Sequence, residues 1–126
     1  MKGTRSLFAA LCAATMISAA APAFAAGDAA AGEKIFNQCK ACHSPVAGKN
    51  LVGPSLFGVV GRKAGSIDGF KYSDAVKNSG VTWTAENLDK WLSGPKDFIA
   101  GNKMTYPGVK DPVGRENVIA YLATLK

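Results

Sequence analysis

The pentapeptide Cys39-Lys40-Ala41-Cys42-His43 is the feature that most constrains how this 126-residue chain can fold. Its two thiols lie one helical turn apart, and an imidazole directly follows the second thiol. In this spacing both thiols reach the vinyl groups on one edge of a porphyrin, and the histidine reaches the iron. The segment therefore predicts covalent attachment of a haem through Cys39 and Cys42, with His43 as an iron ligand.

Three other uses of a Cys-x-x-Cys pair compete with haem attachment. A thioredoxin-like dithiol follows a strand and opens a helix, a context that the sequence does not indicate. A structural zinc site needs four ligands, and beyond Cys39, Cys42 and His43 the chain after residue 25 offers no further cysteine or histidine. A structural disulfide is the third alternative. Haem attachment is the interpretation that the pattern favours.

Residues 1–25 predict a secretory signal peptide. A basic start with Lys2 and Arg5 precedes an apolar stretch, and Ala23-Phe24-Ala25 supplies small residues at the offsets that signal peptidase requires. The apolar stretch is shorter than the ~20 residues that a membrane-spanning helix needs, and Pro22 follows it, which disfavours an anchor. We expect cleavage after Ala25, export, and a working domain of residues 26–126.

The charge distribution argues against a nucleic-acid partner. The whole chain has a formal charge of +6, and loss of Lys2 and Arg5 from its 15 basic residues leaves +4 against 9 acidic residues. The lysines occur singly, without the basic run and interleaved aromatics that are typical of nucleic-acid binding. We expect the domain to meet acidic protein partners instead.

The iron also needs a sixth ligand or an open site. After removal of the signal peptide, Met104 is the one remaining methionine, and no second histidine or spare cysteine competes with it. A lone methionine usually fills a core, but residues 101–108 are polar and bounded by glycines, which indicates a loop. A thioether favours ferrous iron and raises the reduction potential. Met104 is therefore the predicted sixth ligand.

The apolar pattern predicts an all-α fold. Asp28 is an expected N-cap of a helix that runs toward Cys39, and Asp111-Pro112 is an expected start of a C-terminal helix. We expect these terminal helices to pack together, with shorter helical segments between them at residues 73–79 and 84–93. The glycines and prolines of residues 43–67 indicate loops, so a flat apolar cofactor would complete a core that a domain of this size builds with difficulty.

Further segments match one known family in order along the whole domain. They are Gly27-Asp28, Gly32-Glu33-Lys34-Ile35-Phe36, Gly53-Pro54-Ser55-Leu56, Gly61-Arg62-Lys63, Gly69-Phe70-Lys71-Tyr72-Ser73-Asp74-Ala75, Trp83, Lys103-Met104, and Arg115-Glu116 running into Ile119-Ala120-Tyr121-Leu122. In these segments the sequence resembles the class I, mitochondrial-like cytochromes c, in particular the small soluble periplasmic cytochromes of bacteria. The resemblance implies a compact cytochrome c fold around one haem c.

The resemblance also implies roles for residues around the haem. The Pro54 carbonyl should accept a hydrogen bond from His43, which orients the ligand. Arg62, Tyr72 and Trp83 match residues that hydrogen-bond or neutralise the buried haem propionates, which need donors or a cation out of water.

Two positions depart from the commoner family pattern. Trp91 stands where a tyrosine often contacts the methionine sulfur, and an indole can donate only through its single N–H. Asn102 stands where a threonine often donates to a propionate, and its amide can still donate.

The resemblance implies an electron-transfer protein rather than an enzyme. It implies a monomeric periplasmic carrier in an electron-transport chain, which links quinol:cytochrome c oxidoreductase or dehydrogenases to a terminal oxidase or a photosynthetic reaction centre. Five lysines are expected around the exposed haem edge, where they would steer acidic partners: Lys40, Lys49, Lys96, Lys103 and Lys110. The rival function is a haem peroxidase or small-ligand sensor with an open sixth iron site.

Overall fold

The computed structural model describes residues 27–126 together with Gly3, Ala14 and Met16. The signal peptide predicted at residues 1–25 thus falls outside the described residues, apart from these three positions, and stays a prediction. Within the described part of the chain, no helix combines the length and the apolar character that crossing a membrane would require.

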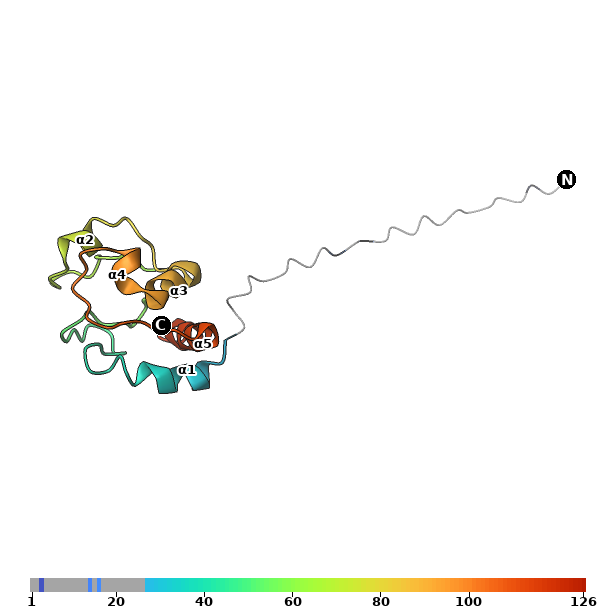
Figure 1. Ribbon diagram of the computed structural model, residues 1–126. Coiled ribbons are helices and arrows are strands. Elements are labelled where there is room, and N and C mark those ends of the chain that lie inside the picture. The colour runs from blue at the N-terminus through green and yellow to red at the C-terminus, as the bar shows by residue number, and fades with distance from the viewer. Residues whose placement is uncertain (1–2, 4–13, 15, 17–26) are drawn as a thin grey trace.

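The domain is built from helices and long loops (Figure 1). The helices are α1 (Ala29–Phe36), α2 (Asp74–Lys77), α3 (Ala85–Ser93), α4 (Pro95–Phe98) and α5 (Pro112–Ala123). Residues 27–126 contain no sheet, and the one strand-like pairing among them is an isolated antiparallel bridge between Lys63 and Thr82. The predicted all-α class is confirmed.

The two terminal helices begin where the sequence predicts. Asp28 caps α1, because its Oδ1 accepts hydrogen bonds from the backbone N–H groups of Ala30 at 2.9 Å and Ala31 at 3.3 Å. Asp111 caps α5 in the same way, and proline occupies the first turn of that helix. Such caps satisfy backbone donors that have no partner inside the helix, so they define each helix start.

Helices α1 and α5 lie side by side, as predicted (Figure 1). Gly32 makes this approach possible, because a Cβ at this position would overlap the carbonyl group of Asn117 in α5. The Asn117 side chain also accepts a hydrogen bond from the backbone N–H of Asp28 at 2.9 Å. Next to this contact, the rings of Phe36 and Tyr121 pack with their centroids 5.0 Å apart.

The middle helices differ from the prediction in one respect. Thr84 caps α3 as expected, and Leu88 and Leu92 face the core. The helical segment ends at Gly94-Pro95 as predicted, since Gly94 is the C-cap of α3, but Pro95 then opens a further helix, α4, that the sequence did not indicate. Proline has no backbone N–H and a helical φ angle, so it is compatible with the first turn of a helix.

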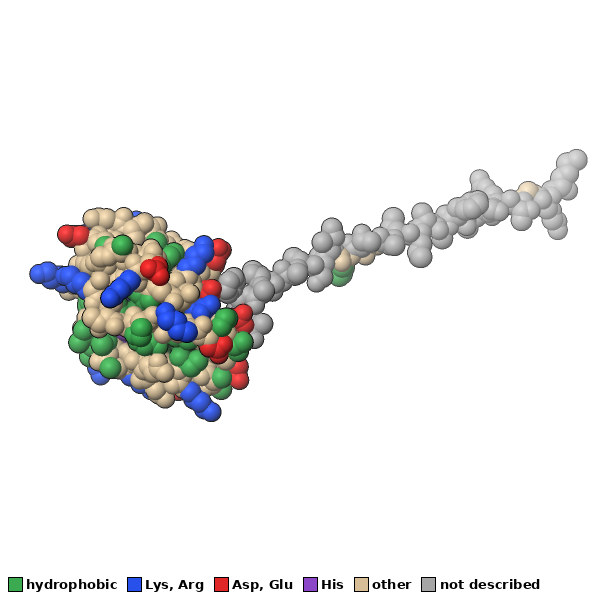
Figure 2. Space-filling model, in the orientation of Figure 1, with side chains coloured by type: hydrophobic (Ala, Val, Ile, Leu, Met, Phe, Trp, Pro, Cys, Tyr) green, Lys and Arg blue, Asp and Glu red, His purple; other side chains and the backbone are tan. Residues whose placement is uncertain are grey.

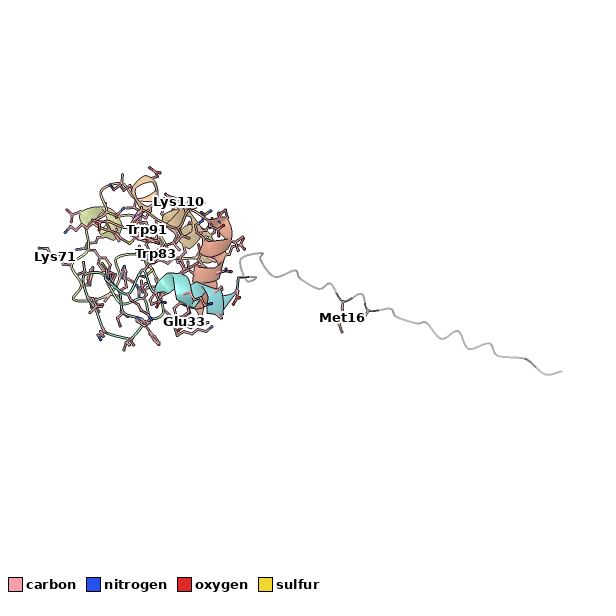
Figure 3. The ribbon with its side chains drawn as sticks, turned by 60° about the horizontal axis from the view of Figure 1, so that its bottom comes forward. Met16, Glu33, Lys71, Trp83, Trp91 and Lys110 are labelled. Atoms are coloured by element: carbon pink, nitrogen blue, oxygen red, sulfur yellow. The ribbon has the colours of Figure 1, made fainter. Side chains whose placement is uncertain are left out.

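A pairing of loops brings distant residues to the interior. The backbone N–H of Trp83 donates to Arg62 O at 2.8 Å, and Gly61 N–H donates to Trp83 O at 2.8 Å. The Trp83 side chain is buried, and it packs against the ring of Trp91 from α3 with centroids 5.2 Å apart and ring planes tilted by 57° (Figure 3). The buried core as a whole consists of Phe36, Val59, Ala64, Trp83, Leu88, Leu92, Ile99, Val118, Ile119 and Leu122.

Candidate functional site

The predicted attachment segment forms a tight turn directly after α1. The backbone N–H groups of Cys42 and His43 both donate to Cys39 O, at 3.1 Å and 2.8 Å. Both cysteines carry free thiols, so the structure does not contain the alternative disulfide. Burial raises the pKa of the Cys39 thiol, and the neighbouring Cys42 raises it further. The turn thus presents two thiols one helical turn apart, as haem attachment requires.

The His43 imidazole is oriented by a backbone carbonyl. Its Nδ1 lies 2.7 Å from Pro54 O, which is the hydrogen bond that the family resemblance implied. Because a carbonyl only accepts, Nδ1 carries the proton and the lone pair is on Nε2. Burial lowers the pKa of His43, and Arg62 lowers it too, while the Pro54 hydrogen bond opposes them. The imidazole is therefore neutral and suited to bind iron through Nε2.

Gly53 also lies against the imidazole. A Cβ on this residue would overlap the His43 ring and lie 2.7 Å from Nδ1. The backbone N–H of Gly53 donates to Cys42 O at 2.8 Å, which holds the two segments together. The Gly53-Pro54 pair therefore serves as a cradle for His43, and only glycine leaves room for the ring.

Arg62 lies next to this cradle. Its Nη2 donates to Ser55 O at 3.0 Å and its Nη1 donates to Phe57 O at 3.1 Å. Burial lowers the pKa of the guanidinium, and Tyr72 opposes that shift. Two of its five N–H donors hold the chain that follows Pro54, and three donors stay available for a propionate.

Tyr72 and Trp83 come to the same region from different loops. The Tyr72 hydroxyl oxygen accepts a hydrogen bond from the backbone N–H of Ile67 at 3.1 Å, which leaves its proton available for donation. The Phe70 ring packs against Tyr72 in an edge-on arrangement with centroids 4.8 Å apart. Trp83 is joined to Arg62 by their backbone pairing. The residues expected to meet the propionates are thus held by partners that leave donor groups free.

Met104 lies half-buried in an irregular loop between α4 and α5. Its backbone N–H donates to Oδ1 of Asn102 at 2.9 Å. The Asn102 amide donates to Pro95 O at 2.9 Å and to Ile99 O at 2.8 Å. Backbone carbonyls thus accept from both amide protons of Asn102 in this structure, and the donation from Asn102 to a propionate stays a prediction.

The structure identifies a contact that the sequence reasoning missed. The Tyr106 hydroxyl donates to Oε1 of Gln38 at 2.7 Å and so joins the Met104 loop to the residue that precedes Cys39. No sequence signal marks this pair, because the two residues are separated by 68 positions. The Gly53 cradle had a signal in its Gly-Pro dipeptide, which marks turns and close approaches.

The described residues offer no alternative metal centre. Among residues 27–126, no three His, Cys, Asp or Glu side chains gather in the way that a metal ion requires. The zinc alternative is therefore not supported. The donors that are present, a neutral imidazole, two thiols and a thioether, fit a haem iron and its porphyrin.

Comparisons with known proteins agree with this donor set. The family model described as Cytochrome c matches residues 29–126. Cytochrome c2 of Rhodomicrobium vannielii is 55% identical over 106 residues, which cover 82% of this chain and 84% of that protein. Cytochrome c2 iso-2 of Magnetospirillum molischianum is 58% identical over 99 residues, which cover 79% of this chain and 99% of that protein. The solved structure of cytochrome cH from Methylobacterium extorquens matches with a TM-score of 0.74 and 55% identity, over 78% of this chain and 99% of that one.

Proposed function

Because this chain belongs to the cytochrome c family, it is an electron carrier with one covalently bound haem c, and we propose that His43 and Met104 are the axial ligands of its iron. The protein is not an enzyme. The observation that carries the ligand proposal is the neutral His43 imidazole, with Nδ1 on Pro54 O at 2.7 Å and Nε2 free. We further propose that the working domain is residues 26–126, that it acts in the periplasm as a monomer, and that Cys39 and Cys42 form the thioether links.

The residues around the haem would support electron transfer by keeping the iron ligands in one fixed geometry. The bound haem supplies the reversible change between ferric and ferrous iron. Pro54 and Gly53 prevent rotation of the His43 ring, and Arg62, Tyr72 and Trp83 supply donors and positive charge beside the propionates. Because both iron ligands would stay in place during the change of charge, little motion of atoms opposes it. A substrate site and a catalytic base are not needed for this function.

The spectrum of the purified holoprotein tests the ligand proposal. We expect the ferric form to show the near-infrared charge-transfer band of a methionine sulfur on iron, since Met104 is the proposed sixth ligand. We also expect the ferrous form to bind almost no CO at neutral pH, because the sixth position is taken. Rapid CO binding by the wild-type protein would instead favour the peroxidase or sensor function.

We propose that the partners are redox proteins with acidic docking surfaces. Quinol:cytochrome c oxidoreductase or dehydrogenases would donate electrons, and a terminal oxidase or photosynthetic reaction centre would accept them. The lysines proposed to steer these partners are all exposed: Lys40, Lys49, Lys96, Lys103 and Lys110. Figure 2 shows blue Lys and Arg side chains around one face of the domain, with green apolar side chains between them.

Two of these lysines, Lys96 and Lys110, lie beside the Met104 loop, which supports the proposed docking surface. Lys96 and Lys110 line one surface hollow of about 320 Å³, together with Tyr106 and Pro107 of the Met104 loop. The Lys110 ammonium donates to Ser93 O at 3.1 Å and Pro107 O at 3.0 Å. Lys110 is therefore held in place beside the loop, so it loses little side-chain entropy when an acidic partner docks.

Electron transfer should depend on salt and on these particular charges. We expect the rate with an acidic partner to fall about tenfold or more between low and high ionic strength, because screening removes electrostatic steering. Lys96→Gln and Lys110→Gln should each lower the low-salt rate about threefold, as expected for the loss of one steering charge. The measurement is stopped-flow reduction of an isolated oxidase or reaction centre.

The matched control removes the same charge elsewhere. Lys71 is exposed and projects away from Lys110 (Figure 3), so Lys71→Gln should leave the rate near the wild-type value. Equal losses for all three variants, or rates that do not change with salt, would contradict the proposed docking surface.

A further inference from the structure

The side chain of Asn102 joins helix α4 to the loop that carries Met104. Its amide nitrogen donates to Pro95 O at 2.9 Å and to Ile99 O at 2.8 Å, at the first residue of α4 and at its C-cap. Its carbonyl oxygen accepts from the backbone N–H of Met104 at 2.9 Å. Both carbonyls also accept a backbone hydrogen bond, Pro95 O from Ile99 N–H at 3.1 Å and Ile99 O from Asn102 N–H at 3.3 Å, so the amide adds a second contact to each.

The loop beyond Asn102 has few hydrogen bonds of its own. Within residues 103–108, all of which the structure describes, the Met104 N–H is the one backbone donor that has a partner. The far end of the loop is held by Val109 N–H, which donates to Leu92 O at 2.7 Å. Asn102 is thus the anchor on the N-terminal side of Met104, two residues away from it.

We propose that Asn102 is a positioning residue, which holds the Met104 backbone where the thioether can reach the iron. This inference rests on the proposed ligation by Met104. It differs from the role that the family resemblance implies, since the side chain uses both amide protons on the protein rather than on a propionate. An asparagine suits this role because a short side chain with two donors and one acceptor can serve all three partners.

Entry of an external ligand to the ferric iron measures how firmly the loop holds Met104. Imidazole binds only when the methionine leaves, so its association rate reports opening of the loop. We expect Asn102→Ala to speed imidazole binding about tenfold, because it removes three hydrogen bonds that water replaces only in part. The near-infrared sulfur band should also disappear at a lower temperature on heating than in the wild-type protein.

A conservative variant tests the acceptor alone. In Asn102→Thr the hydroxyl oxygen can still accept from the Met104 N–H, while the pair of amide donors is lost. Its imidazole rate should lie between those of the wild-type protein and the alanine variant. If Asn102→Ala does not yield holoprotein, a rate for Asn102→Thr that is raised about threefold supports the proposal, as expected for partial loss of the contacts. A rate equal to that of the wild-type protein overturns it.

Two controls separate positioning from general loss of stability. Asn87 is a half-buried asparagine whose amide donates to Thr82 O at 2.8 Å, so Asn87→Ala removes a similar contact from the start of α3. It should leave the imidazole rate unchanged. In a Met104→Ala background, Asn102→Ala should have no further effect, because there is no thioether left to position.

The results of these experiments distinguish failure of the positioning role of Asn102 from failure of the proposed ligation by Met104. Equal imidazole rates for the wild-type protein and Asn102→Ala, or equal acceleration by Asn87→Ala, overturn the role of Asn102 while ligation by Met104 stands. A wild-type protein that lacks the sulfur band overturns the ligation, and the positioning role falls with it.

Discussion

Replacement of Met104 by alanine is expected to abolish the near-infrared sulfur band while the haem stays covalently attached. The thioether is the proposed sixth ligand, whereas attachment would depend on Cys39 and Cys42, whose turn is 60 and more residues away in the sequence. Ferrous Met104→Ala should then bind CO rapidly at neutral pH, in contrast to the wild-type protein. Optical spectra of both redox states and CO flash photolysis provide the measurement.

The reduction potential of the same variant should fall. A thioether stabilises ferrous iron, and water or hydroxide in its place stabilises ferric iron. Axial ligation sets haem potentials over a span of roughly 0.8 V, so loss of the sulfur should shift the potential by a sizeable part of that span. Potentiometric titration would detect the shift easily.

The neighbouring residue supplies the control for Met104→Ala. Thr105 lies in the same loop and is exposed, so Thr105→Ala should retain the sulfur band and the wild-type potential. A Met104→Ala protein that keeps the band, or that still excludes CO, would show that another group occupies the sixth position.

Substitution of Gly32 should cause the largest loss of stability in the helical scaffold. In Gly32→Ala the new Cβ would overlap the Asn117 carbonyl and lie 2.9 Å from Val118 Cα, so α1 and α5 must separate. Overpacking of this kind typically costs about 1–3 kcal/mol. Backbone atoms cannot rotate away as a side chain can, so we expect a cost at the upper end of that range. Gly32→Val should cost more still.

Part of this cost is offset by helix propensity. Alanine is favoured over glycine inside a helix by about 1 kcal/mol, which stabilises the variant locally. The steric term should still be the larger one, so the free energy of unfolding in guanidinium chloride should fall by about 2 kcal/mol for alanine. Far-UV circular dichroism of the holoprotein follows the transition.

Gly114 in α5 is the matched control for Gly32. A Cβ there would lie 3.2 Å from Val109 Cγ1 and 3.3 Å from Ile35 Cδ1, which are the ends of side chains that can shift. Gly114→Ala should therefore change the free energy of unfolding by less than about 1 kcal/mol, which is the size of the helix-propensity advantage of alanine over glycine. Similar losses at both glycines would show that close approach of backbones is not what Gly32 provides.

Much of the scaffold was predictable because its signals are local. The caps at Asp28, Thr84 and Asp111 each depend on one side chain and the N–H groups two or three residues further on. The end of the middle helix at Gly94 was predicted correctly, but α4 was not, because a proline that follows one helix can also begin another.

The sequence by itself determined the chemistry of the candidate site. The spacing of Cys39, Cys42 and His43 is a property of the chain that no fold changes. The same holds for Met104, which is the single methionine outside the predicted signal peptide. The comparisons agree with the cofactor that this chemistry requires.

Only the tertiary structure decided how those groups are held. The Gly53 cradle, the link from Tyr106 to Gln38 and the use of the Asn102 amide on α4 all join segments that meet after folding or depend on the path of a loop. A hydrogen bond requires atoms within about 3 Å and in line. Residue types limit which hydrogen bonds a side chain can make, and the packing of the chain selects the partner. The Asn102 side chain, for example, bonds Pro95 O, Ile99 O and the Met104 N–H.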